Sequence, residues 1–114
     1  DPLIDAESFK LEEKRVICIG KKNPSLNQVD GQYMGILKIT PEGWNKMRSL
    51  YQTFSREKQE SIDMTSFLQE LIWKNIPVTA AAIKGCWCEV DSEDDLLLYN
   101  KKLMGKGWSH DWRW

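Results

Sequence analysis

The stretch from Gly85 to Leu96 reads GCWCEVDSEDDL, and its pattern predicts a strand that runs directly into a helix. Alternate residues of a strand share a face. One face of this strand is apolar and suited to a core, and it carries Cys86, Cys88 and Val90. The other face carries Trp87, Glu89 and Asp91. Two carboxylates on one face repel each other, and a divalent cation such as Mg²⁺, which prefers oxygen ligands, would offset that repulsion.

A simpler interpretation is that the acidic residues only begin the next helix. Ser92 can cap that helix, with Asp95 three residues later as in a capping box, and the acids between them favour the helix dipole. This accounts for residues 92–95. It explains Glu89 poorly, because Glu89 lies before the cap and inside the strand. The pattern alone leaves both interpretations of Glu89 and Asp91 open.

Outward from this stretch, apolar periodicity and cap signals predict strands and helices in alternation. Residues 1–15 are polar and are expected to be irregular. The expected strands are Val16–Ile19, Gln32–Ile39 and Val78–Ile83, and the expected helices follow the caps Thr40, Asp63 and Ser92. Gly35 interrupts the second strand and indicates that something approaches its backbone closely. The order predicts an α/β fold with a mixed, mostly parallel sheet and flanking helices.

Composition excludes several classes of function. The chain has 114 residues and a net charge of −1, without the basic face that nucleic-acid binding needs. No apolar run approaches the roughly 20 residues that span a bilayer. We therefore expect neither nucleic acid nor membrane as a partner. Three cysteines exclude a full disulfide framework, which favours a cytoplasmic location. The first residues, from Asp1 to Asp5, resemble the middle of a polypeptide, so a fragment is expected.

Four segments in order resemble the sugar-phosphate nucleotidyltransferases, and more closely their bacterial phosphocholine cytidylyltransferase-like members. Trp87 to Leu96 resembles the closing strand and helix of that family. The strand before Lys21 resembles the one that ends in a substrate-phosphate lysine. Gly31 to Ile36 resembles the strand whose glycine lines the substrate pocket, and the segment from Asp63 to Val78 resembles the approach to the last central strand. The resemblance runs from about Asp1 to Leu103.

The resemblance implies the C-terminal portion of a Rossmann-like (GT-A-like) nucleotidyltransferase domain over residues 1–104, followed by a Trp-rich tail over residues 105–114. Family members transfer a nucleoside monophosphate from a nucleoside triphosphate to a small phosphorylated substrate and release pyrophosphate. Magnesium is the implied cofactor. By match to the family motifs, the metal ligands are Glu89 and Asp91, and the substrate-binding residues are Lys21, Tyr33, Gly35 and Trp87. The nucleotide loop and the first metal ligand would lie in a missing N-terminal half, without which the fragment is expected to be inactive.

Gly20 departs from the family pattern, because many sugar-specific members carry an acid before the phosphate lysine. The closing strand also has Glu89-Val90-Asp91 where those members tend to carry Asp-Thr-Gly. Both departures favour phosphocholine over a sugar 1-phosphate. Tyr33 and Trp87 could form an aromatic box for a quaternary ammonium group, or they could simply pack. The alternative function is a non-catalytic binding or assembly module, whose Trp-rich tail could reach a partner or a second copy in a homo-oligomer.

Overall fold

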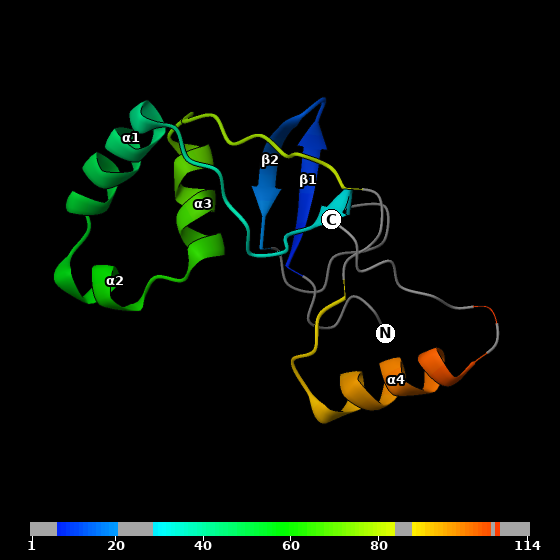
Figure 1. The fold of residues 1–114 in the computed structure, drawn as a ribbon. Coiled ribbons are helices and arrows are strands. Elements are labelled where there is room, and N and C mark those ends of the chain that lie inside the picture. The colour runs from blue at the N-terminus through cyan, green and yellow to red at the C-terminus, as the bar shows by residue number, and fades with distance from the viewer. Residues whose placement is uncertain (1–6, 21–28, 84–87, 106, 108–114) are drawn as a thin grey trace. The chain divides into compact units, whose positions relative to one another are not determined.

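A computed structural model of the protein describes residues 7–20, 29–83, 88–105 and 107. The chain divides into two compact units, Asp1–Ala81 and Ala82–Trp114. Among the described residues, the first unit holds a small sheet and three helices, and the second holds a single helix (Figure 1). Nowhere in the described part does a helix have the length and apolarity that crossing a membrane requires. The predicted division into residues 1–104 and a tail of residues 105–114 stays a prediction.

The sheet has three strands, β1 (Ser8–Glu12), β2 (Arg15–Ile19) and β3 (Gly31–Gln32), in the order β2-β1-β3. Both neighbouring pairs are antiparallel. Strand β1 lies in the stretch that was expected to be irregular. It was missed because its hairpin to β2 turns through Glu13, which adopts a left-handed φ of 56°, where Asn or Gly is the usual signal.

Strand β2 confirms the predicted strand at Val16–Ile19, but only one of its faces is covered. Val16 pairs with Leu11 and Cys18 pairs with Lys10, so Ile17 is an extra residue that bulges from the ladder. A bulge resets the alternation of side chains. Val16 and Ile19 therefore both face the core although they are three residues apart, and Ile17 is 42% exposed. Although Val16 to Ile19 are all apolar, the strand is buried on one face only.

A mostly parallel sheet is not confirmed, because every pairing among the described strands is antiparallel. The expected strand at Gln32–Ile39 is reduced to Gly31–Gln32. The expected strand at Val78–Ile83 is reduced to a bridge between Thr79 and Arg15, supported by a 2.8 Å hydrogen bond from the Val16 N–H to the Val78 carbonyl. These segments have strand-like composition, but a strand also needs a partner with which to pair.

Helices α1 (Pro41–Gln52) and α3 (Met64–Trp73) confirm two predicted helices and their caps. The Thr40 hydroxyl accepts a 3.0 Å hydrogen bond from the Gly43 N–H, and Pro41 occupies the first turn, where its missing N–H costs nothing. Asp63 caps α3 in the same way. That helix ends before Asn75, which adopts a left-handed φ of 56°.

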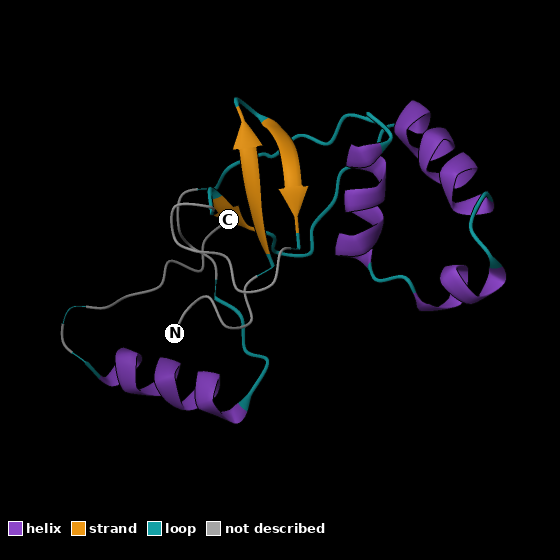
Figure 2. Ribbon diagram, turned by 180° about the vertical axis from the view of Figure 1, so that it is seen from behind, coloured by secondary structure: helices purple, strands orange, loops and turns teal. Residues whose placement is uncertain are grey.

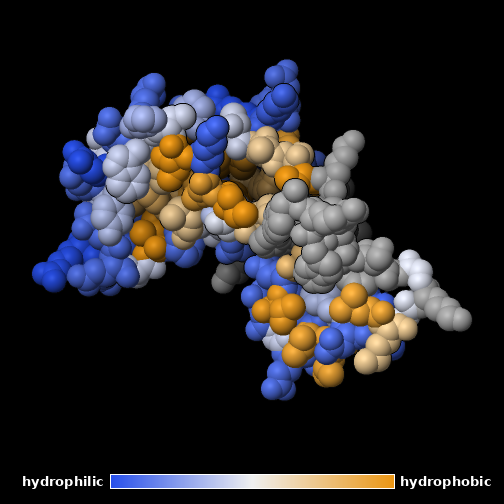
Figure 3. Space-filling view, in the orientation of Figure 1, coloured by the Kyte–Doolittle hydropathy of each residue, from blue (hydrophilic) through white to orange (hydrophobic). Residues whose placement is uncertain are grey.

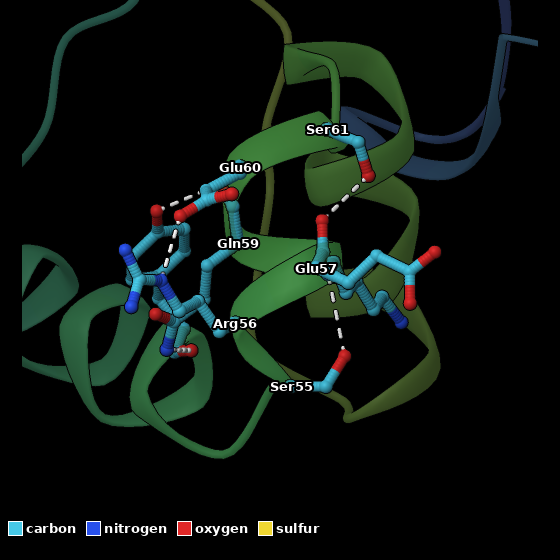
Figure 4. Close-up of polar contacts among 8 residues, drawn as sticks. Ser55, Arg56, Glu57, Gln59, Glu60 and Ser61 are labelled. Carbon is cyan, nitrogen blue, oxygen red and sulfur yellow. Dashed lines mark hydrogen bonds and ion pairs between the residues drawn. The ribbon is translucent and has the colours of Figure 1, made fainter.

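Helix α2 (Arg56–Ser61) was not among the helices predicted from the sequence. It buries no residue, so it lacks the apolar period that reveals a helix in a sequence. Local polar contacts support it instead (Figure 4). The Ser55 hydroxyl accepts a bond from the Lys58 N–H, Arg56 pairs with Glu60 at 2.8 Å, and the Ser61 hydroxyl donates to the Glu57 carbonyl at 2.9 Å.

The core of the first unit lies between the sheet and the helices. Helix α3 lies beside β2 with α1 on its other side, as both ribbon views show (Figure 2). Leu71 on α3 is the most buried of the described hydrophobic side chains in this core, at 2% exposure. The buried cluster consists of Val16, Ile19, Met47, Leu50, Phe67, Leu68 and Leu71. Edge-to-face contacts among Tyr51, Phe54 and Phe67 extend it toward α2.

In the second unit, helix α4 (Glu93–Met104) confirms the last predicted helix, with Ser92 as its cap. None of its described residues is buried. Its leucines are exposed, and apolar side chains are visible on its surface (Figure 3). The helix is therefore defined by its capping and its backbone hydrogen bonds rather than by a core.

Candidate functional site

Tyr33, a predicted substrate position, and Gly20, the residue before the predicted phosphate lysine, lie at one end of the small sheet. The Gly20 N–H donates to the Ser8 carbonyl at 3.0 Å, and the Tyr33 N–H donates to the Glu7 carbonyl at 2.9 Å. Because β1 is the central strand, these two bonds place the end of β2 and the residue after β3 on either side of its first residues. Lys21 follows Gly20 directly in the sequence. Lys21 and Trp87 themselves lie outside the described residues.

The end of β2 is fixed on the first turns of α3. The Ile19 N–H donates to the Gln69 side-chain oxygen at 2.9 Å. Gly20 has a left-handed φ of 73°, and a Cβ added to it would lie 3.3 Å from the Cβ of Thr65. Thr65 is buried, so it has little freedom to move away. The left-handed backbone of Gly20 therefore favours glycine, and Thr65 leaves little space for a side chain there.

Asp63 holds the first turn of α3 together. Its carboxylate accepts hydrogen bonds from the Ser66 N–H at 2.7 Å, from the Ser66 hydroxyl at 2.9 Å and from the Thr65 hydroxyl at 2.9 Å. These bonds, the one from the Ser66 N–H foremost, lower the pKa of Asp63 below its ordinary value of 3.8. Asp63 is thus a charged cap whose oxygen atoms are already engaged.

Tyr33 is half-buried and packs against the edge of the core. Burial, followed by the nearby Glu7 carboxylate, raises the pKa of its phenol above the ordinary value of 10.0. Tyr33 therefore stays neutral at physiological pH and can offer a ring face and a hydroxyl to a ligand.

Gly35 has a left-handed φ of 80°, and a Cβ placed on it would meet no described atom within 4 Å. The expected close approach to its backbone is therefore not found among the described atoms. The left-handed conformation explains the glycine instead. Its role in a substrate pocket stays a prediction.

Glu89 and Asp91 lie in the second unit, just before α4, and both are exposed. The predicted strand is wrong for residues 88–91, which form no strand, and Val90 is exposed instead of facing a core. The Asp95 carboxylate accepts bonds from the Ser92 hydroxyl at 2.7 Å, the Ser92 N–H at 2.9 Å and the Asp91 N–H at 3.2 Å. The Ser92 hydroxyl in turn accepts from the Asp95 N–H at 3.2 Å, so the predicted capping box is confirmed. The Ser92 hydroxyl is the main cause of the lowered pKa of Asp95.

Capping therefore uses Ser92 and Asp95 and leaves the side chains of Glu89 and Asp91 outside the box. Their carboxylate oxygens are ligands that suit Mg²⁺. Within the described ranges, no three His, Cys, Asp or Glu side chains lie together as a metal site. Two carboxylates alone would be an incomplete ligand set, and the role of Glu89 and Asp91 as metal ligands stays a prediction.

Thr65 and Gln69 of α3 contact this end of the sheet, where Glu7 also lies. None of these three residues was predicted from the sequence. Thr65 lies in the segment from Asp63 to Val78 that resembles the family. Nothing in that segment indicated that Thr65 would pack against Gly20. Glu7 falls in the stretch that was expected to be irregular. A separate open depression of about 630 Å³, lined by residues such as Lys46 and Lys74, contains none of the predicted site residues.

The chain is similar to the CTP:phosphoglutamine cytidylyltransferase of Campylobacter jejuni subsp. jejuni serotype O:2, with 34% identity over 108 residues. The similarity covers 90% of this chain and 43% of the relative, in the C-terminal part of that protein. The chain thus spans less than half the length of this curated relative. No family model matches the chain, and no solved structure matches it. The similarity confirms the predicted resemblance to the C-terminal part of a nucleotidyltransferase.

Proposed function

The chain is related to the C-terminal part of a nucleotidyltransferase, and from this premise we propose that it works as part of an enzyme that transfers a nucleoside monophosphate to a small phosphorylated acceptor. The 34% identity to a cytidylyltransferase over 90% of the chain is the observation that carries this proposal. The same similarity supports transferase activity, with a nucleoside triphosphate as one of the substrates.

In the proposed reaction, an oxygen of the acceptor phosphate attacks the α-phosphorus of the triphosphate. The new P–O bond forms as the bond from the α-phosphorus to the bridging oxygen breaks, and pyrophosphate leaves. Lys21 would hold the acceptor phosphate by its charge. Glu89 and Asp91 would hold Mg²⁺, which would neutralise phosphate charge as pyrophosphate leaves.

For the donor we propose a cytidine nucleotide, because the relative's name specifies CTP. For the acceptor we propose phosphocholine or another small phosphorylated alcohol as the first choice, and a sugar 1-phosphate as the second. The geometry of Gly20 supports this order. Its φ of 73° and the nearness of Thr65 disfavour any side chain at the position where sugar-specific enzymes carry an acid. The relative's name also specifies a phosphorylated amino acid rather than a sugar.

We also propose that the intact protein contains a mostly parallel, Rossmann-like sheet. We infer that the described sheet and helices pack against an N-terminal half that supplies the parallel strands, the nucleotide loop and a further metal ligand. The relative contains more than twice the length matched here, which leaves room for such a half. The chain alone should therefore be inactive.

A pyrophosphate-release assay on the full-length protein tests the proposal. Phosphocholine, phosphoethanolamine, phosphoglutamine and several sugar 1-phosphates are each combined with each of the four triphosphates, with and without Mg²⁺. We expect Mg²⁺-dependent release, fastest with CTP and a non-sugar acceptor. Release confined to sugar 1-phosphates would overturn the acceptor assignment, and no release from any pair would overturn the enzyme assignment.

The second candidate is a non-catalytic binding module. Trp44 and Trp73 are 54% and 69% exposed, and large exposed aromatic residues are typical of interaction surfaces. If every triphosphate and acceptor pair fails in the assay, these tryptophans are the positions to replace in a search for a binding partner.

A further inference from the structure

Helix α1 and the residues that end α3 line the open depression of about 630 Å³. Its volume lies within the roughly 300–1,000 Å³ of typical small-molecule pockets. All of its lining residues belong to the continuous described range 29–83, and so do their neighbours in the sequence. The residues from α1 recur three and four positions apart, from Glu42 to Thr53, so they form one face of that helix. The depression therefore has one wall from α1 and another from the end of α3.

A tight chain reversal fixes the wall that follows α3. The Ile76 N–H donates to the Leu71 carbonyl at 2.9 Å. The Asn75 N–H donates to the Ile72 carbonyl, also at 2.9 Å. With the left-handed conformation of Asn75, these bonds form a Schellman motif. The motif holds Lys74 and Ile76 at the depression, a cation close in the chain to an apolar side chain.

The lining side chains offer positive charge and hydrogen-bond donors to a ligand. Lys74 is exposed and forms no ion pair with any acidic residue in the described ranges. Asn45 and Ser49 are exposed too, and among the described residues their side chains have no hydrogen-bond partner. Lys46 pairs with Glu42 at 2.7 Å, but the pair is exposed, and an exposed pair competes weakly with an incoming anion.

The depression matches an anion that also has an apolar part. Two lysines and one glutamate give its lining one net positive charge. Leu50 and Ile76 add apolar surface to the lining. A lysine ammonium is a compact charge that suits a phosphate group, and amide and hydroxyl groups donate to phosphate oxygens. A cationic ligand would gain none of these interactions.

We propose that this depression binds a small organic phosphomonoester. Lys46 and Lys74 hold the phosphate by their charge, and Asn45 and Ser49 donate to its oxygen atoms. The organic part lies against Ile76. The depression contains none of the residues assigned to nucleotidyl transfer, so the inference does not rest on the proposed function. It adds a second ligand site, which takes no part in the chemistry at phosphorus.

Amide NMR of the full-length protein tests the proposal, with phenyl phosphate as the probe and sodium chloride at equal ionic strength as the reference. Wild type is compared with Lys74→Gln and with the matched control Arg48→Gln. Arg48 is an exposed cation of α1 that does not line the depression. We expect the amide signals of α1 and of residues 74–76 to shift saturably in wild type. The Kd should rise at least about threefold in Lys74→Gln and less than about twofold in Arg48→Gln. The signals of β1 and β2 show whether each variant retains the fold.

The same titration with inorganic phosphate separates the phosphate from the organic part of the ligand. We expect inorganic phosphate to bind more weakly than phenyl phosphate, because it makes no contact with Ile76. Equal affinities would refute that contact and with it the assignment of an organic ligand.

Shifts that grow without saturating, or equal rises in Kd for both variants, would overturn the proposal, because attraction to surface charge in general would then explain them. Saturable shifts confined to the residues around Gly20 and Tyr33 would also overturn it, since they would place the ligand at the proposed acceptor site. Each of these outcomes leaves the proposed function intact.

Discussion

Replacing Gly20 with alanine should destabilise the protein more than replacing Gly35 with alanine, although both glycines have a left-handed backbone. Their φ angles, 73° and 80°, are nearly the same. The two sites differ in their surroundings. A Cβ on Gly20 would lie 3.3 Å from Thr65, and a Cβ on Gly35 would meet no described atom within 4 Å.

The left-handed conformation costs alanine about 1–2 kcal/mol at either site. At Gly20 the contact with Thr65 adds about 1 kcal/mol, the lower end of the usual cost of overpacking, because Thr65 is buried and bonded to Asp63 and has little room to shift. The entropy that alanine removes from the unfolded chain is the same for both variants and cancels in the comparison. The difference between the two variants should therefore be about 1 kcal/mol.

Urea denaturation followed by tryptophan fluorescence measures this difference, with wild type and both variants at the same pH and ionic strength. With a urea slope of about 1–3 kcal/mol/M, Gly20→Ala should unfold about 0.3–1 M earlier than Gly35→Ala. Equal midpoints, or an earlier midpoint for Gly35→Ala, would refute the assignment of Thr65 as the residue that closes the space beside Gly20.

Three further predictions follow from the caps and the exposed carboxylates. Asp63→Ala should lower the free energy of unfolding, measured by urea denaturation at pH 7, by about 0.5–2 kcal/mol. Because the folded pKa of Asp63 lies below 3.8, the charged cap stabilises the protein fully above that pH. The difference in unfolding free energy between wild type and variant should therefore narrow as the pH falls through the folded pKa. A difference that stays constant from pH 7 to pH 2 would contradict this. Ser92→Ala should speed amide hydrogen exchange in α4 and leave α3 unchanged, whereas equal effects on both helices would argue against a local cap. In the full-length protein, Glu89→Gln combined with Asp91→Asn should lower turnover at least about 100-fold. The control Glu93→Gln should change turnover less than about twofold. Full activity in the double variant would show that neither Glu89 nor Asp91 holds a metal needed for turnover.

Three helices that begin with a capping residue were predicted from the sequence. Thr40, Asp63 and Ser92 each accept a bond from the backbone of the helix they precede, as their positions before apolar or acidic runs indicated. The capping box of Ser92 and Asp95 was predicted to the residue. These features depend on contacts within four residues, which a single sequence records.

Features that depend on distant partners were not predicted. The bulge at Ile17 exists because β2 pairs with β1, and the turn through Glu13 lacks the usual hairpin residues. Helix α2 has no apolar period because its contacts are polar, among them the ion pair of Lys58 with Glu70 of α3. The backbone contact between Glu7 and Tyr33 also depends on the strand order.

The most direct test of nucleotidyl transfer is phosphorus NMR of the product formed by the full-length protein from CTP, phosphocholine and Mg²⁺. The account predicts that the phosphocholine signal is replaced by two coupled signals of a diphosphate that joins cytidine to choline, while pyrophosphate accumulates in equal amount. Two coupled signals show that a phosphate oxygen of the acceptor has attacked the α-phosphorus. Release of pyrophosphate with free CMP and unchanged phosphocholine, phosphoglutamine and other acceptors would show hydrolysis of CTP instead, and would contradict the account.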